Sequence, residues 1–113
     1  MNEKDFLSGA SVLLDPTRLQ IVELLSWYGI LCACSLLSHL SIRQGTLSHH
    51  MKVLTESGLV HCTKKGKWCY YRLDRKRIAE LGEFLTFLSS EPKEEEDVFC
   101  SCGDEEKCFF RYR

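Results

Sequence analysis

Apolar residues recur with the period of an α-helix in several segments, and residues that start or stop helices separate them. Residues 3–13 predict a first helix, and Asp15-Pro16 marks the start of a second, because Asp caps helices and Pro suits the first turn. Gly29 marks the end of that second helix. The apolar edges of the two helices are Phe6, Ala10, Leu13 and Leu14, then Ile21, Leu24, Leu25 and Tyr28. We expect these edges to form part of the core.

Two further helices with a short join are predicted before Gly58. The first carries an apolar stripe with i, i+3, i+4, i+7 spacing, and the second begins near Gln44 and carries a similar stripe. The stripes are Ala33, Leu36, Leu37 and Leu40, then Leu47, Met51 and Leu54. Gly58 can take the left-handed conformation that ends a helix. Because the second helix is polar on its outer faces, the pair predicts a helix-turn-helix.

The chain then changes from helical period to alternation. Residues 59–64 and 67–73 predict two half-buried strands, joined by a Lys65-Gly66 turn. This turn places Cys62 directly opposite Cys69, about 5 Å apart, where the thiols are either small buried side chains or a redox-active pair. Residues 75–89 predict a last helix whose apolar face, with Ile78, Leu81, Leu85, Leu88, Phe84 and Phe87, suits pairing with a second copy. The fold class is mainly α with a small β-hairpin, in a homodimer.

Composition divides the chain into a folded part and a tail. We expect residues 1–90 to form one DNA-binding and dimerisation domain, and residues 91–113 to form an acidic, cysteine-containing tail of net charge −4. The beginning of the chain lacks the pattern of a secretory signal, and no apolar run is long enough to span a membrane, so we expect a cytoplasmic protein without a membrane partner. Seven cysteines are many for that reducing compartment and suggest metal ligation, redox sensing or burial.

A strong positive charge lies on the helix-turn-helix and hairpin. Residues 43–77 carry nine basic and two acidic side chains, a net charge of +7, which favours double-stranded DNA as a partner. Four side chains early on the second helix of the motif are placed to reach base edges, namely Gln44, Thr46, Ser48 and His49. The expected phosphate contacts are Arg43, Lys52, Lys64, Lys65 and Lys67. His50 faces either a phosphate or the core.

Three motifs carry a resemblance to a known family. DPTRLQIVELL, TLSHHMKVLTESGLV and KKGKWCYYRL resemble the winged helix-turn-helix metalloregulators of the ArsR (ArsR/SmtB) type, over residues 3–90. The resemblance implies a homodimeric repressor that leaves its operator DNA when a toxic metal or metalloid binds. LCACSLL at 31–37 resembles the thiolate box of the arsenic-responsive branch, which implies Cys32 and Cys34 as metal ligands. Where that branch often has a third cysteine, this chain has Leu37. The histidines of the family's zinc-binding branch are absent from DRKRIAELGEFL at 74–85.

Soft thiolates without nearby histidine favour As(III) or Sb(III) as effector, with Cd(II) or Pb(II) as further candidates. On an ideal helix Cys32 and Cys34 point nearly opposite ways, because successive residues rotate by about 100°. One ion would therefore hold both only if the first turn of that helix unwinds. Such a distortion would reduce the DNA-competent population. A third sulfur is available from Cys100, Cys102 or Cys108, which alternatively form a separate three-thiol site.

Other functions remain open at this point. The first alternative is a DNA-binding repressor that responds to thiol oxidation, or to Cd(II) or Pb(II), and the second is an interaction or metal-sequestering module without DNA affinity. We do not expect an enzyme, because no nucleophile–base arrangement or phosphate-binding loop is recognisable.

Overall fold

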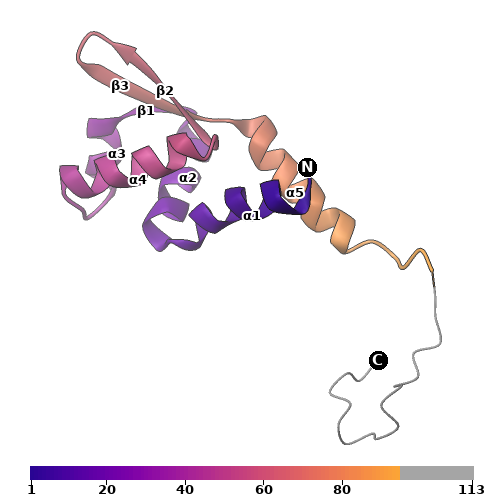
Figure 1. The fold of residues 1–113 in the computed structure, drawn as a ribbon. Coiled ribbons are helices and arrows are strands. Elements are labelled where there is room, and N and C mark those ends of the chain that lie inside the picture. The colour runs from indigo at the N-terminus through magenta and orange to yellow at the C-terminus, as the bar shows by residue number, and fades with distance from the viewer. Residues whose placement is uncertain (95–113) are drawn as a thin grey trace, which may run out of the picture.

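The computed structural model describes residues 1–94, which form five α-helices, one short 3₁₀ turn and a three-stranded sheet. The helices are α1 (Glu3–Ser11), α2 (Pro16–Tyr28), α3 (Ala33–His39), α4 (Gln44–Glu56) and α5 (Arg75–Leu88). The 3₁₀ turn is Val12–Leu14, and the strands are β1 (Ile30–Cys32), β2 (Val60–Lys65) and β3 (Trp68–Leu73). The β2–β3 hairpin projects beyond the helices, and α1 lies beside α5 (Figure 1).

The helices follow from the capping residues and apolar stripes of the sequence. The Asp15 carboxylate accepts hydrogen bonds from the Thr17 and Arg18 backbone N–H groups, at 2.9 and 3.0 Å, and so caps α2. Gly29 and Gly58 have φ values of +86° and +82°, which end α2 and the α4 region as predicted. The predicted first helix is shorter than expected, because the chain tightens into the 3₁₀ turn after Ser11.

One apolar core joins α2, α3, α4 and the base of the hairpin. Its fully buried side chains are Ile21, Leu25, Leu36, Leu47, Leu54, Leu59 and Val60. The stripe predicted for α4 and the Ile21 and Leu25 part of the α2 stripe therefore face this core. The expectation is wrong for Tyr28 at the end of α2 and for Leu14 just before α2, which are 52 % and 83 % exposed. On α5, by contrast, only Leu81 of the predicted apolar face is buried, and Leu85 and Leu88 are 55 % and 62 % exposed.

The strand register differs from the prediction by one residue at the turn. Cys62 pairs with Tyr71 and Lys64 with Cys69, so that Gly66-Lys67, not Lys65-Gly66, connects the strands. Gly66 has a φ of +62° whereas Lys67 does not have a positive φ, as a type II′ hairpin turn requires. This register pairs Val60 with Leu73, which are both buried in the core. The predicted opposition of Cys62 and Cys69 is wrong.

The sheet also contains a strand that the sequence did not predict. β1 pairs antiparallel with β3, giving the strand order β1-β3-β2 and setting Cys32 opposite Tyr70. Cys32 is thus the last residue of a strand and the N-cap residue of α3, with extended backbone angles (φ −80°, ψ 164°). The expectation that Cys32 and Cys34 both lie on one helix is therefore wrong.

Candidate nucleic-acid interface and thiolate site

The α4 helix presents a polar outer surface while its opposite face is anchored in the core. Leu47, Met51 and Leu54 are at most 2 % exposed, which fixes the helix against α2 and α3. The other faces carry the predicted base-reading side chains Gln44, Thr46, Ser48 and His49, all of which are exposed. Arg43 is the N-cap residue of α4, and both Arg43 and Lys52 are exposed as well.

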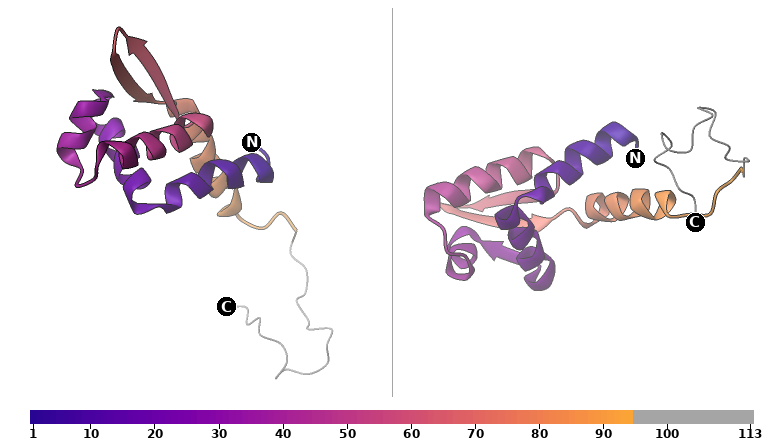
Figure 2. Two further views of the ribbon diagram at one scale, coloured as in Figure 1. Left: turned by 60° about the vertical axis from the view of Figure 1, so that its left-hand side comes forward. Right: turned by 90° about the horizontal axis from the view of Figure 1, so that it is seen from below.

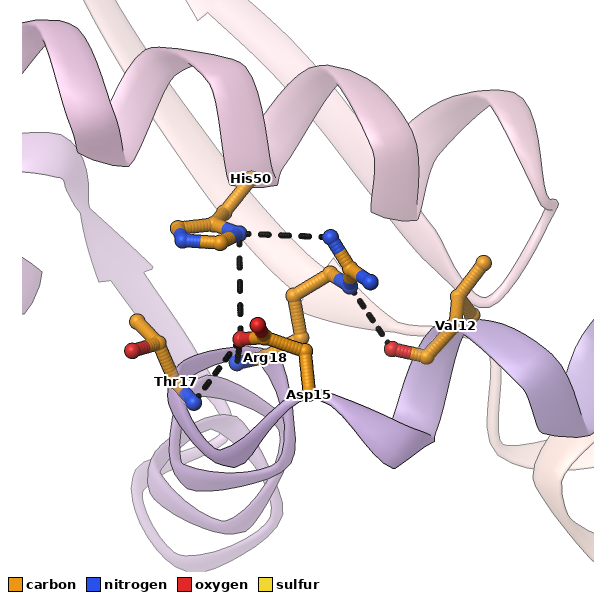
Figure 3. Close-up of polar contacts among 5 residues, drawn as sticks. All are labelled: Val12, Asp15, Thr17, Arg18 and His50. Atoms are coloured by element: carbon orange, nitrogen blue, oxygen red, sulfur yellow. Dashed lines mark hydrogen bonds and ion pairs between the residues drawn. The ribbon is translucent and has the colours of Figure 1, made fainter.

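His50 points toward α2 and away from the outer surface of α4. Its side chain is 12 % exposed, and its Nδ1 lies 3.4 Å from Arg18 Nη1 and 4.0 Å from Asp15 Oδ2. Figure 3 shows His50 descending from α4 onto these two residues at the start of α2. Arg18 Nε in turn donates a 2.8 Å hydrogen bond to the Val12 carbonyl. His50 therefore links α4 to the capped start of α2 and to the 3₁₀ turn.

Asp15 is an ionised partner in this network. Hydrogen bonds from the backbone, chiefly that of Arg18, hold the pKa of its carboxyl below the ordinary value, with further contributions from His50 and the Arg18 guanidinium. Sequence reasoning identified Asp15 only as a cap and did not find Arg18. A polar pair at the start of α2 and a histidine on α4 are 32 residues or more apart, so only the packing of the two helices relates them.

The tip of the hairpin is basic and open to solvent. Lys64, Lys65 and Lys67 are all exposed. The hairpin projects beyond the helices in Figure 1 and in the left view of Figure 2. Exposed lysines at such a tip suit phosphate contacts, which provide affinity without reading sequence.

The thiols of Cys32 and Cys34 converge where β1 passes into α3. Their Sγ atoms are 2.7 Å apart, and the Ser35 hydroxyl lies 3.2 Å from the Cys32 sulfur. The extended backbone at Cys32 makes this possible, because Cys32 precedes the first helical turn. The two sulfurs are thus together without any unwinding of α3. Ser35 is a contact that the sequence analysis missed.

The two thiols have different acidities. Hydrogen bonding from the Cys34 thiol, and then from Ser35, lowers the pKa of Cys32 from an ordinary value of 9.0 to about 7. The same thiol pair raises the pKa of Cys34, together with desolvation. Thiolate is the metal-binding form of cysteine, so at pH 7 this pair has one ligand that is already about half ionised.

A third ligand for the pair is not found in the part of the chain that the structure describes. Among residues 1–94 there is no cluster of three or more His, Cys, Asp or Glu side chains suited to a metal ion. Cys100, Cys102 and Cys108 lie outside the described residues. Within the described part, no helix is long and apolar enough to cross a membrane.

The fold is a winged helix-turn-helix of the DNA-binding class. It combines α3 and α4, which pack on the core, with an exposed outer surface on α4 and a basic β2–β3 hairpin. Comparison with known proteins is more specific. The sequence profile described as "Bacterial regulatory protein, arsR family" matches residues 15–61. The chain is 38 % identical over 102 residues to the arsenical resistance operon repressor of Staphylococcus xylosus, covering 90 % of this chain and 92 % of that protein. The chain belongs to the ArsR family of transcriptional regulators.

Other relatives agree with this assignment. The arsenical resistance operon repressor of Escherichia coli K12 is 50 % identical over 62 residues, covering 55 % of this chain and 53 % of that protein. A crystal structure described as a possible transcriptional regulator for arsenical resistance matches with a TM-score of 0.66 at 34 % identity, covering 75 % of this chain and 88 % of that one. A homodimeric winged helix-turn-helix domain from Mycobacterium bovis has a TM-score of 0.62 at 23 % identity and supports the fold alone.

Proposed function

We propose that this protein is a metalloid-responsive transcriptional repressor. It binds operator DNA as a homodimer and releases it when As(III) or Sb(III) binds Cys32 and Cys34. The observation that carries the proposal is the convergence of these two sulfurs at the β1–α3 junction. Relatives named as arsenical resistance operon repressors support the choice of effector. Residues 1–90 form the DNA-binding and dimerisation domain, and residues 91–113 form the acidic tail.

The DNA contacts in this proposal divide by element. Gln44, Thr46, Ser48 and His49 on α4 read bases, because they are exposed on a helix sized for the major groove. The phosphates are contacted by Arg43, by Lys52 and by three lysines of the β2–β3 hairpin, which is the wing of the fold: Lys64, Lys65 and Lys67. His50 acts through the orientation of α4, because it contacts α2.

Release follows from the different attachment of the two ligands. Cys32 is held by β1, which pairs with β3, whereas Cys34 is on α3, which contacts α4. An ion bound to both sulfurs therefore ties the start of α3 to β1. This constraint on α3 is passed to α4 through the contact between the two helices. This mechanism replaces the unwinding of α3 that the sequence suggested.

As(III) commonly takes three sulfurs, and the pair supplies two. Cys100, Cys102 and Cys108 are the candidates for the third, in this chain or in its partner. Cd(II) is a second candidate effector, because a cadmium resistance regulator homologue of Staphylococcus aureus is 34 % identical over 82 residues; Pb(II) has a similar preference for sulfur.

The test is operator binding by the reduced full chain, with DNA from upstream of its own gene, measured with and without arsenite. We expect arsenite to weaken binding at least tenfold, within the usual range of allosteric coupling. Cys34→Ser should bind DNA normally and lose the response. Ser38→Ala, an exposed change on the same helix, is the matched control and should keep it. A full arsenite response in Cys34→Ser would refute the assignment of the site.

A further inference from the structure

The wing carries a second group of thiols that the proposed function does not use. Cys62 on β2 and Cys69 on β3 are free cysteines, the first exposed and the second half-buried. Cys62 pairs directly with Tyr71, and Cys69 pairs with Lys64. Because directly paired residues point to the same face of a sheet and alternate residues share that face, Cys62, Cys69, Tyr71 and Lys64 all lie on one side of the hairpin.

The observed register decides what these thiols can do together. Cys62 and Cys69 are diagonal neighbours, for which cross-strand separations are about 7–8 Å between Cα atoms rather than the 5 Å of an opposed pair. A disulfide needs Cβ atoms about 3.5–4.5 Å apart and cannot bridge Cα atoms beyond about 7 Å without backbone movement. A paired β-ladder resists that movement. An ion between the sulfurs adds two metal–sulfur bonds of about 2.3 Å each, which suits the longer diagonal.

The pKa values of Cys62 and Tyr71 are shifted in part by neighbouring side chains on this face of the hairpin. Desolvation, and then the neighbouring Cys69 thiol, raise the pKa of Cys62, while Lys64 acts in the opposite direction. Burial raises the pKa of Tyr71 to about 12, with contributions from both Cys62 and Cys69. The Tyr71 hydroxyl is therefore protonated at neutral pH. A thiol with a raised pKa, such as Cys62, is a poor target for oxidants, but a soft metal can displace its proton.

We propose that Cys62 and Cys69 form a two-thiolate site on the wing for a soft, two-coordinate metal ion, with the chemistry of Cu(I). Two ligands exclude the four-coordinate sites that zinc prefers, and no third His, Cys, Asp or Glu joins the cluster among residues 1–94. Thiolates select Cu(I) among the soft ions of the cell. Binding replaces two S–H bonds with two Cu–S bonds and releases two protons. It leaves a complex of charge −1, which Lys64 on the same face offsets.

The site is tested in a full-length chain that retains only these two cysteines. The variant is Cys32→Ser, Cys34→Ser, Cys100→Ser, Cys102→Ser and Cys108→Ser together, and Cu(I) is supplied anaerobically as its bicinchoninate complex. We expect the chain to withdraw one Cu(I) per protomer from the chelator. Adding Cys62→Ser should abolish this withdrawal. Because Cys32 and Cys34 are absent, failure here is independent of any failure of the arsenite response.

A matched control separates the geometry from the number of thiols. In the same background, Cys62→Ser with Thr63→Cys keeps two cysteines but moves one to the opposite face of the sheet, since Thr63 pairs with Tyr70. This chain should bind Cu(I) at least tenfold more weakly than the parent. Equal binding by both chains would overturn the proposal. Quantitative formation of a Cys62–Cys69 disulfide with peroxide, detected as a mass loss of two protons, would overturn the diagonal geometry on which it rests.

Discussion

At the scale of single residues, the Cys32–Cys34 pair shows how backbone conformation sets thiol chemistry. Two residues apart on a helix, these thiols would point away from each other. With Cys32 in an extended conformation, they share a hydrogen bond instead. The shared bond lowers the pKa of Cys32 to about 7 and raises that of Cys34. The first metal–sulfur bond therefore forms on a sulfur whose deprotonation costs little near neutral pH.

This asymmetry predicts the pH dependence of alkylation. Iodoacetamide reacts with thiolate, so the rate at Cys32 should rise through a midpoint near pH 7 and level off above it, while Cys34 should require a higher pH. Cys34→Ala removes the largest cause of the shift and should move the Cys32 midpoint upward, toward 9. Peptide mass spectrometry resolves the two sites. Equal midpoints for Cys32 in the two chains would contradict a shared hydrogen bond.

At the scale of secondary-structure elements, the helices could be predicted from sequence and the sheet only in part. Asp15, Gly29 and Gly58 are local signals, and each acts in the structure as a local rule requires. β1 has only three residues and exists because β3 provides a partner 40 residues away, so no local pattern indicates it. The hairpin register depends on whether Gly66 is the first or the second residue of the turn. In the structure it is the first, and this register places Val60 opposite Leu73, with both side chains buried in the core.

The same limit applies to the candidate site. The residue types at positions 32 and 34 indicated a soft metal, but the convergence of their sulfurs depends on β1 and was not predictable without it. His50 is a similar case, because its two readings differ only in how α4 packs on α2. In the structure it contacts Arg18 and Asp15.

The contact between α4 and α2 leads to a prediction for His50. His50→Ala removes the hydrogen-bond partner of Arg18 Nη1 and should destabilise the fold by about 1 kcal/mol and weaken DNA binding several-fold by loosening α4. The dependence of binding on salt should not change, because no phosphate contact is lost. His50→Gln can still accept from Arg18 and should restore part of the affinity. A smaller salt slope in His50→Ala would instead indicate a phosphate contact.

Substitutions in the wing, unlike His50→Ala, should change the salt dependence of DNA binding. Lys65→Gln with Lys67→Gln removes two exposed charges at the hairpin tip. If each contacts one phosphate in each protomer, the slope of log K against log salt should become shallower by about 0.9 per contact. Affinity should fall equally for specific and random DNA, as fluorescence anisotropy with both can measure. Lys4→Gln, an exposed lysine on α1, is a control that should leave the slope unchanged.

At the scale of the whole molecule, α1 and α5 together leave apolar side chains exposed. Phe6 and Phe84 stack with ring centroids 4.4 Å apart and join the two helices. Beyond this contact Leu7, Leu85, Phe87 and Leu88 are each more than half exposed. A group of large apolar side chains on one surface marks an interface. α5 runs away from the hairpin tip (Figure 1), so a partner bound on this helix leaves the proposed phosphate contacts of the tip free.

This arrangement predicts that dimerisation and tight DNA binding are lost together. Leu85→Glu with Leu88→Glu places two charges on the proposed interface and forfeits about 2 kcal/mol of apolar burial for each leucine. The protein should sediment as a monomer, and operator affinity should fall by at least 100-fold, because two linked recognition helices bind two half-sites far more tightly than separate ones. Ile30→Glu, which changes an exposed apolar residue of β1, should remain dimeric. If the double variant stays dimeric at micromolar concentration, the interface lies elsewhere, and the exposed leucines of α5 need another partner.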